Sequence, residues 1–174
     1  MTQQIDENAL FDMGYGMYIV AAELDGKPNG QIVTAAIQTT AKPPCIVACI
    51  HKDNLTHDYI AKSGRFTLSV LEQDTPMIFI GTFGFKSGRD GDKFTQAGFK
   101  TGVTGCPIVT DHALSVIEAT LMQQVDVGTH TMFVGEVVAA EVLRQGTPLT
   151  YAHYRQVKKG KTAKNAPTFH APAG

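Results

Sequence analysis

The sequence predicts a mainly β protein, in which an antiparallel sheet curves into a closed or split barrel with a few short helices beside it. Apolar, β-rich runs bounded by turn residues occur at residues 15–24, 31–40, 45–50 and 66–71. Two longer strand candidates, residues 114–127 and 131–143, are separated by three residues and form a hairpin. Helix-period stretches are short, and 17 glycines and 8 prolines among 174 residues favour β structure. A barrel hides the edges of such a sheet.

The first three strands are separated by turn residues. Residues 25–30, Asp-Gly-Lys-Pro-Asn-Gly, predict a tight loop after the first strand. The second strand covers residues 31–40 and ends before Pro43 and Pro44, because proline cannot donate to a sheet ladder. Residues 45–50 follow as the third strand.

Two helices are indicated by their end signals. Asn54 is expected to cap a helix that runs to about Lys62 and ends at Gly64. Thr75 and the proline after it are an N-cap and a first-turn residue, and this helix continues over residues 77–83.

The remaining segments are predicted to be irregular. Residues 81–105 are rich in glycine and loop residues, and from Tyr151 the strand pattern gives way to an extended tail. At about residues 155–174 this tail is basic and has no acidic residue; its cations are Arg155, Lys158, Lys159, Lys161 and Lys164. The tail is either solvated or lies across an acidic surface of the same subunit or of a partner.

Length, charge and cysteine content limit the class of protein. The length fits one domain over residues 1–174, and a net charge of −1 gives no case for nucleic acid. Cys45, Cys49 and Cys106 are odd in number and include no CxxC pair, so we expect neither a disulfide framework nor a metal site. The start of the chain is polar and no apolar run reaches membrane length, so we expect a cytoplasmic protein without a membrane partner.

One strand alternates polar and apolar residues in a way that suits a flavin. Residues 29–35 and then 38–40 offer amides and hydroxyls on one face while the other face packs. A flavin ring needs donors for its carbonyls and N5, an acceptor for N3–H, and backbone close to its plane. An ordinary edge strand with threonines facing solvent is the alternative.

Two further segments suit an anion. Residues 87–94 combine glycines, a serine hydroxyl, Arg89 and Lys93, as a loop around a terminal phosphate would, although a charged surface turn is the alternative. The loop lacks the ending of a Walker loop and is no dinucleotide fingerprint. Residues 51–57 gather cations and a hydroxyl at a predicted helix start, where the helix dipole favours an anion.

His130 lies between the two long strands. Such a histidine is either a surface residue or one that reaches the mouth of a ligand site and positions a nicotinamide. The sequence contains no Ser-His-Asp order, no paired carboxylates in an apolar run and no nucleophile elbow, so nothing in it supports a hydrolase.

Several segments taken in order carry a resemblance. They are Asn29-Gly30-Gln31-Ile32-Val33, Lys42-Pro43-Pro44, Asn54-Leu55-Thr56-His57, Phe83-Gly84-Phe85-Lys86-Ser87-Gly88-Arg89-Asp90, Asp92-Lys93-Phe94, Gly128-Thr129-His130-Thr131 with Gly135-Glu136-Val137, and Val157-Lys158-Lys159-Gly160-Lys161-Thr162. Together they resemble the flavin reductase-like family, whose fold is an FMN-binding split β-barrel, a Greek-key antiparallel barrel with a few short flanking helices. The likeness runs from about Tyr15 to Phe169.

Within that family the likeness is closest to the flavin reductase module of NAD(P)H:rubredoxin oxidoreductases, and flavoredoxins look similar. No cysteine follows Cys106, so we expect no rubredoxin domain in this chain. The family often has Gly-Asp-His where this chain has Gly128, Thr129 and His130, which alters the electrostatics of the expected nicotinamide contact.

The resemblance implies a homodimeric FMN oxidoreductase. Hydride would pass from NAD(P)H to FMN, with His130 positioning the nicotinamide, and then to an acceptor such as rubredoxin or free flavin. Each flavin would lie near the subunit interface, with the basic tail across it. The residues implied in cofactor binding are Asn29, Gly30, Gln31, Ile32, Val33, Thr34, Gln38, Thr39, Thr40, Cys49, Ile50, His51, Lys52, Thr56, Phe85, Ser87, Gly88, Arg89 and Lys93. An electron-transfer flavoprotein without a nicotinamide site and a flavin-binding barrel without turnover are the alternatives.

Overall fold

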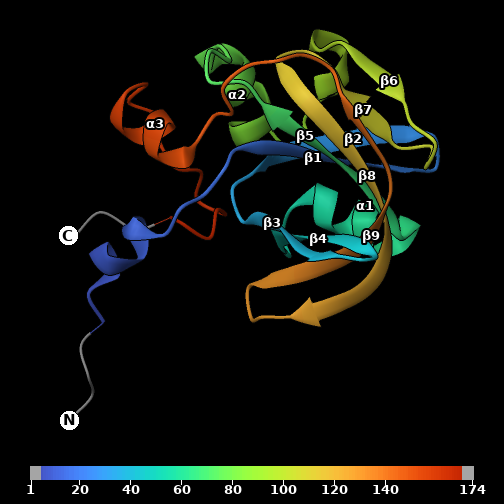
Figure 1. Ribbon diagram of the computed structural model, residues 1–174, viewed down its shortest axis with the longest axis horizontal. Helices are drawn as coiled ribbons and strands as arrows, with labels where there is room; N and C mark the ends of the chain where they lie inside the picture. Colours follow the sequence, from blue (N-terminus) through green and yellow to red (C-terminus); the bar gives the residue numbers. More distant parts are fainter. Residues whose placement is uncertain (1–4, 170–174) are drawn as a thin grey trace.

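The computed structural model describes residues 5–169 and shows a curved antiparallel sheet with short helices around it (Figure 1). The strands of the main sheet are β1 (Tyr18–Leu24), β2 (Lys27–Val33), β3 (Ala36–Ala41), β4 (Pro44–His51), β5 (Arg65–Leu71), β8 (Ala113–Asp126) and β9 (His130–Val142). A separate pair is formed by β6 (Phe99–Thr101) and β7 (Pro107–Val109). The helices are η1 (Glu7–Asp12), α1 (Leu55–Ser63), α2 (Met77–Phe85), η2 (Lys93–Gln96) and α3 (Tyr151–Gln156), of which η1 and η2 are 3₁₀.

The seven strands of the main sheet pair in the order β2-β1-β5-β8-β9-β4-β3. β2 and β3 follow one another in the chain and yet form its opposite edges. The sheet therefore has to curl until these two edges approach each other. The predicted mainly β, antiparallel barrel with short flanking helices is confirmed.

The single strand predicted at residues 31–40 is wrong. β2 begins earlier, after a two-residue turn in which Asp25 and Gly26 both have positive φ (52° and 76°), as a tight hairpin requires. The chain bends after β2, where the Ala36 N–H donates to the Thr34 carbonyl (3.0 Å). Beyond this bend β3 pairs with β4 and no longer with β1, so the segment crosses from one edge of the curled sheet to the other.

The long hairpin is confirmed as β8 and β9, of 14 and 13 residues. The helix predicted after Asn54 is confirmed as α1, and Gly64 ends it with φ 68°. α2 begins one residue later than predicted, because Pro76 and not Thr75 holds the N-cap position. It also runs two residues past the predicted end.

Two segments predicted to be irregular contain regular structure. Residues 81–105 include the end of α2, all of η2 and β6. The tail predicted to start at Tyr151 instead begins with α3, where the Thr150 side chain accepts a hydrogen bond from the His153 N–H (3.1 Å). A helix of six residues is too short for its period to be read, and it is stabilised by burial of Tyr151 and Tyr154.

The two faces of β1 pack into different parts of the core. Ile19 and Ala21 belong to a cluster that also contains buried residues of α2 and α3. Val20 and Ala22 face a second cluster, inside the curl of the sheet, to which α1, β4 and β9 contribute. This alternation follows from the two-residue period of a strand, and it fixes α2 and α3 on one side of β1 and α1 on the other. None of the helices within residues 5–169 is long and apolar enough to cross a membrane.

Candidate functional site

A cavity of about 470 Å³ lies between β2, the start of α1, the end of α2 and the segment after α3. We call residues 157–168 the C-terminal tail. Side chains of Ile32, Ile80 and Phe83 form part of an apolar wall, and polar residues of β2, α1 and the C-terminal tail complete the lining. A volume of this size and a mixed lining are typical of small-molecule and cofactor sites.

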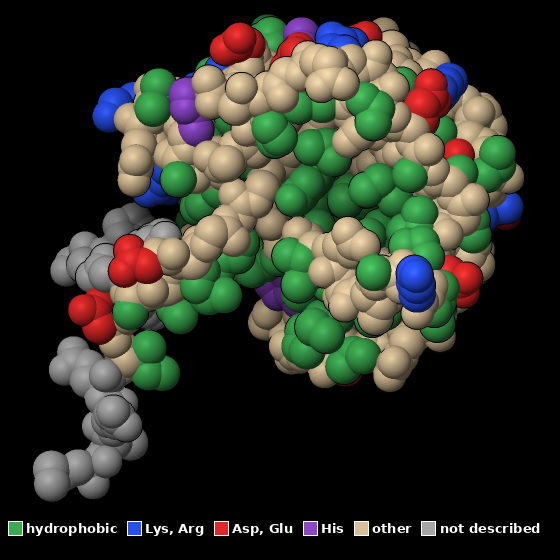
Figure 2. All heavy atoms as spheres, viewed as in Figure 1, with side chains coloured by type: hydrophobic (Ala, Val, Ile, Leu, Met, Phe, Trp, Pro, Cys, Tyr) green, Lys and Arg blue, Asp and Glu red, His purple; other side chains and the backbone are tan. Residues whose placement is uncertain are grey.

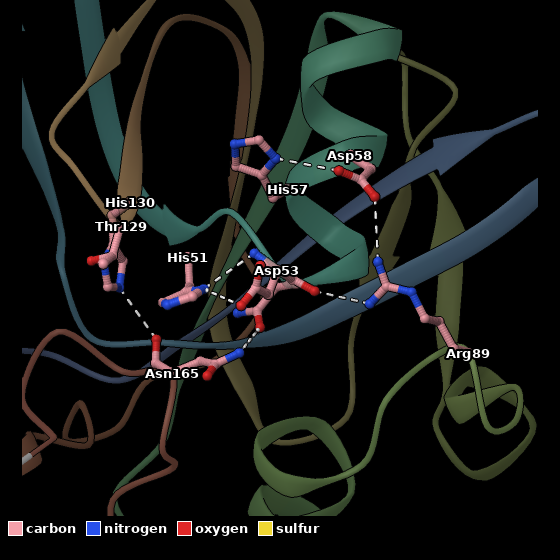
Figure 3. A network of polar contacts seen from close by, with 9 residues as sticks. His51, Asp53, His57, Asp58, Arg89, Thr129, His130 and Asn165 are labelled. Carbon is pink, nitrogen blue, oxygen red and sulfur yellow. Dashed lines mark hydrogen bonds and ion pairs between the residues drawn. The ribbon is translucent and has the colours of Figure 1, made fainter. Parts of the chain in front are cut away.

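One end of the cavity collects groups that attract an anion. The loop of residues 87–89 and the N-terminus of α1, at Thr56, both line it. Arg89 links the two elements, because its guanidinium donates to the Asp53 carbonyl (2.9 Å) and to the Asp58 carboxylate (3.3 Å) (Figure 3). The guanidinium and the positive end of the helix dipole together favour a negatively charged ligand group.

Gly88 lets the loop approach β2 closely. A Cβ at this position would collide with the amide of Asn29, so a larger residue would push the loop away. Asn29 is buried, and its Nδ2 donates to Thr56 Oγ1 (2.8 Å). The loop, β2 and α1 are therefore held in one fixed arrangement at this end of the cavity.

Lys93 is a buried cation that lines the same cavity. Its Nζ donates to the Gly30 carbonyl (2.7 Å) and lies 5.9 Å from the centre of the Phe83 ring. None of the ion pairs found within residues 5–169 involves Lys93. Burial lowers the pKa of Lys93 from 10.5 to about 8, because desolvation disfavours the charged form. An anionic ligand group would supply the charge that the protein does not.

Two threonine hydroxyls in the cavity wall lack a hydrogen-bond partner. Thr34, at the bend between β2 and β3, and Thr168, in the C-terminal tail, are each 6% exposed. The Oγ1 atom of each is buried and makes no hydrogen bond within the described part of the chain. Buried polar side-chain atoms nearly always have a partner, so these two hydroxyls are suited to polar atoms of a ligand.

A pair of histidines borders the cavity. His51 lines it, and its ring meets that of His130 edge to face, with 4.9 Å between centres. His130 Nε2 lies 3.2 Å from the carbonyl oxygen of Asn165, which can only accept, so Nε2 carries the proton and Nδ1 accepts from Thr129 Oγ1 (2.8 Å) (Figure 3). Burial above all, and proximity to His51, lower the pKa of His130, which favours the neutral form of its ring.

The model of the flavin reductase like domain family matches residues 10–160. The chain belongs to the flavin reductase-like family. This flavin reductase-like chain is 48% identical over 165 residues to a ferric-chelate reductase (NAD(P)H) of Archaeoglobus fulgidus, covering 95% of this chain and 98% of the relative. It is 47% identical over 165 residues to a high molecular weight rubredoxin of Moorella thermoacetica, covering 95% and 72%.

Solved structures agree with this assignment. The flavin reductase HpaC in complex with NADP⁺ superimposes with a TM-score of 0.72 at 25% identity, over 83% of this chain and 90% of that one. The predicted family and the predicted class of fold are therefore confirmed.

The cavity of this flavin reductase-like chain brings together most of the residues predicted to bind the cofactor. Those in its lining are Asn29, Gln31, Ile32, Val33, Thr34, Cys49, His51, Thr56, Phe85, Ser87, Gly88, Arg89 and Lys93. Those outside the lining are Gly30, Gln38, Thr39, Thr40, Ile50 and Lys52, and His130, predicted to position the nicotinamide, is outside it as well.

The residues outside the lining have other surroundings in the described structure. Ile50 is fully buried in the barrel core, and residues 38–40 are exposed on the edge strand β3. Lys52 is paired with Asp126 at the surface (2.7 Å). His130 reaches the cavity edge through Asn165 and His51.

Sequence reasoning did not find the part of the lining that follows β9. Tyr151, Tyr154 and residues 161–168 all line the cavity. The one available signal was the basic composition of the tail, which predicted either a solvated segment or one that lies across an acidic surface. In the structure the tail contacts tyrosine hydroxyl, guanidinium, amide and imidazole groups of its own subunit, through hydrogen bonds that the net charge of the tail does not reveal.

Proposed function

We propose that this protein is an NAD(P)H-dependent flavin reductase that holds FMN in the cavity and passes electrons to a separate acceptor. The observation that carries the proposal is the division of the cavity into a cationic end and an apolar body with unpartnered hydroxyls. FMN requires this division, because its phosphate is anionic while its ring is flat and apolar with a polar rim. Membership of the flavin reductase-like family makes the chain a flavin-binding oxidoreductase.

The residues at the cationic end would hold the phosphate. Arg89 and Lys93 supply positive charge, and the Ser87 hydroxyl, which accepts from the Arg89 N–H (3.1 Å), can donate its own proton to a phosphate oxygen. Gly88 holds the loop close against Asn29, where a Cβ would not fit. The ring would pack against the half-buried Ile32, with polar groups of β2 along its rim.

Bound FMN supplies the redox chemistry, since its N5 accepts a hydride and its reduced form releases electrons. The protein orients the two reactants and excludes water. His130 is suited to the nicotinamide, because burial favours the neutral form of its ring and its Nε2–H can donate to a carboxamide oxygen once the Asn165 carbonyl withdraws. The ferric-chelate reductase relative, whose name includes NAD(P)H, and the HpaC complex with NADP⁺ support a nicotinamide donor.

For the acceptor we propose a rubredoxin-type protein or free flavin. The relative named high molecular weight rubredoxin, which extends beyond its match to this chain, supports the first. The free thiols of Cys45, Cys49 and Cys106 support a reducing, cytoplasmic location.

We also propose a homodimer. Ile37 of β3, Met122 of β8 and Val138 of β9 are 64%, 59% and 50% exposed. Figure 2 shows hydrophobic side chains over the lower lobe, where Figure 1 places β3, β4 and the β8–β9 hairpin. Apolar surface of this kind favours association of two copies. Light scattering should give twice the 18.7 kDa of one chain, and the mass of a monomer with flavin bound would rule the dimer out.

The proposed activity is tested in two steps. The protein is mixed with FMN, desalted, and its absorption spectrum is recorded; a retained flavin spectrum is expected. Anaerobic mixing with NADH or NADPH should then bleach the flavin, and addition of oxidised rubredoxin should restore it. A protein that takes up no FMN contradicts the proposal, and a flavin that only a reduced protein can bleach would indicate an electron shuttle.

A further inference from the structure

The C-terminal tail folds back onto its own subunit through hydrogen bonds at several points. The Tyr154 hydroxyl donates to the Lys161 carbonyl (2.7 Å), and the Arg155 guanidinium donates to Thr162 Oγ1 (2.8 Å). Nearer the start of the tail, the Lys158 ammonium donates to the Thr75 carbonyl (3.2 Å). The segment is thus anchored on α3 and on the loop before α2, and two of the anchored residues, Lys161 and Thr162, already line the cavity.

A side-chain pair then fastens the tail to α1. Asn165 Nδ2 donates to Asn54 Oδ1 (2.9 Å), and the Asn165 carbonyl contacts His130 Nε2 (3.2 Å) (Figure 3). Asn54 holds the N-cap position of α1, yet its side chain makes no capping hydrogen bond. A side-chain cap typically stabilises a helix, so Asn54 forgoes this contribution and binds the tail instead.

Beyond this fastening, the tail places a buried hydroxyl against the cavity. Thr168 is 6% exposed and its Oγ1 has no partner within residues 5–169. Thr34 also lines this cavity, and its buried Oγ1 likewise has no partner within residues 5–169. A buried threonine lowers the stability of the fold unless its hydroxyl makes a hydrogen bond, because burial removes the hydroxyl from water.

We propose that residues 161–168 are the closing wall of the flavin site, and that Thr168 is a flavin-binding residue that hydrogen-bonds a polar group of the cofactor outside its phosphate. The tail thereby retains FMN as a prosthetic group and limits its release as a free product. This inference rests on the proposed function and extends it to a segment, residues 161–168, that lies beyond the matched residues 10–160.

The test replaces the hydroxyl by a methyl group of the same size. Thr168→Val should weaken both FMN and riboflavin by about three- to tenfold, since one neutral hydrogen bond is lost and the phosphate is not involved. The same substitution should leave the ligand-free protein equally or more stable in thermal unfolding. Loss of affinity without loss of ligand-free stability is the signature of a hydroxyl whose partner is the ligand.

Thr67→Val is the matched control. Thr67 is fully buried outside the cavity, and its hydroxyl donates to the Pro107 carbonyl (2.6 Å). This substitution should destabilise the ligand-free protein and leave flavin affinity unchanged. Unchanged flavin affinity in Thr168→Val would overturn the proposal, as would destabilisation of its ligand-free form like that of the control.

The proposed role of the tail in retaining FMN is tested by removing the hydrogen bond between Asn165 and Asn54. Asn165→Ala removes the donor to Asn54 and should speed FMN dissociation in stopped-flow fluorescence by about three- to tenfold. An unchanged dissociation rate would overturn the closing role. Wild-type protein that takes up no FMN would contradict the proposed function itself, whereas wild-type binding with unaffected variants would contradict this inference alone.

Discussion

The strongest prediction concerns Lys93, whose charge is buried without an acidic partner. Its pKa is about 8 in the folded protein and 10.5 in the unfolded chain. At ~1.36 kcal/mol per tenfold change in proton affinity, the charged form costs the ligand-free fold about 3 kcal/mol near neutral pH. Because the unfolded chain binds more protons between these two pKa values, this cost is present below pH 8 and disappears as the pH rises toward 10.5.

The substitution Lys93→Met removes the titrating group and keeps most of the side-chain length. Between about pH 7.5 and 9.5 the ligand-free wild type should gain roughly 2 kcal/mol relative to Lys93→Met, as measured by urea unfolding at each pH. The comparison with the variant cancels the tyrosines and cysteines that titrate in the same range. A difference that stays constant with pH would refute the reasoning.

Ligand affinity should change with the opposite sign. A phosphate monoester is mostly a dianion above pH 7, so charged Lys93 is the form that binds FMN. As Lys93 loses its proton above pH 8, FMN affinity should fall about twentyfold between about pH 7.5 and 9.5, provided that the bound phosphate keeps the lysine charged. Riboflavin, which has no phosphate, should show no such fall in a fluorescence titration, and Lys93→Met should abolish it for FMN. Equal pH dependence for the two flavins would place Lys93 away from the phosphate.

Three further predictions use other residues of the site. Arg89→Ala should weaken FMN binding about tenfold or more, with little effect on riboflavin binding. Asp58→Asn should strengthen FMN binding, because it removes a carboxylate that competes for Arg89. Calorimetric titration measures both affinities, and equal changes for FMN and riboflavin would contradict the assignment of Arg89 to the phosphate. His130→Ala should lower kcat/KM for NADH or NADPH about ten- to hundredfold at unchanged FMN affinity, and unchanged anaerobic single-turnover rates would remove His130 from the site. Glu118→Gln should destabilise the fold by about 1–3 kcal/mol in urea without altering flavin affinity. Its buried carboxylate accepts hydrogen bonds from Val103 and Thr104, which do not line the cavity, so a changed FMN affinity would contradict this.

The elements that could be predicted from the sequence are those fixed by local chemistry. The β8–β9 hairpin follows from two long β-rich runs joined by three residues, and α1 follows from Asn54 and Gly64 at its ends. The bend at Thr34 could not be predicted from local sequence, since the residues before and after it all suit a strand. It exists because the two halves pair with different partners across a curled sheet, which is a property of the closed topology.

Part of the candidate site likewise follows from local chemistry, and the rest depends on tertiary packing. The loop of residues 87–89 was legible because glycine, serine and arginine suit a phosphate wherever they occur together. Its contact with the start of α1 depends on tertiary packing, and so does the place of Thr168 in the cavity wall. The sequence predicts Lys93 as a cation of the phosphate loop, but its isolation from acids is visible only when its neighbours in space are known.

Lys93, Thr34 and Thr168 share a physical property that links ligand binding to folding. Each is buried at the cavity with a charge or hydroxyl that the described protein leaves uncompensated, and the three come from η2, the β2–β3 bend and the C-terminal tail. One ligand that bonds all three would therefore relieve three separate costs and tie distant parts of the chain together. Mass action alone stabilises a protein by about 2.7 kcal/mol at a hundredfold excess of ligand over Kd. FMN should thus protect the backbone amides of the C-terminal tail from hydrogen exchange more than those of β6 and β7, and equal protection of both would separate the tail from the site.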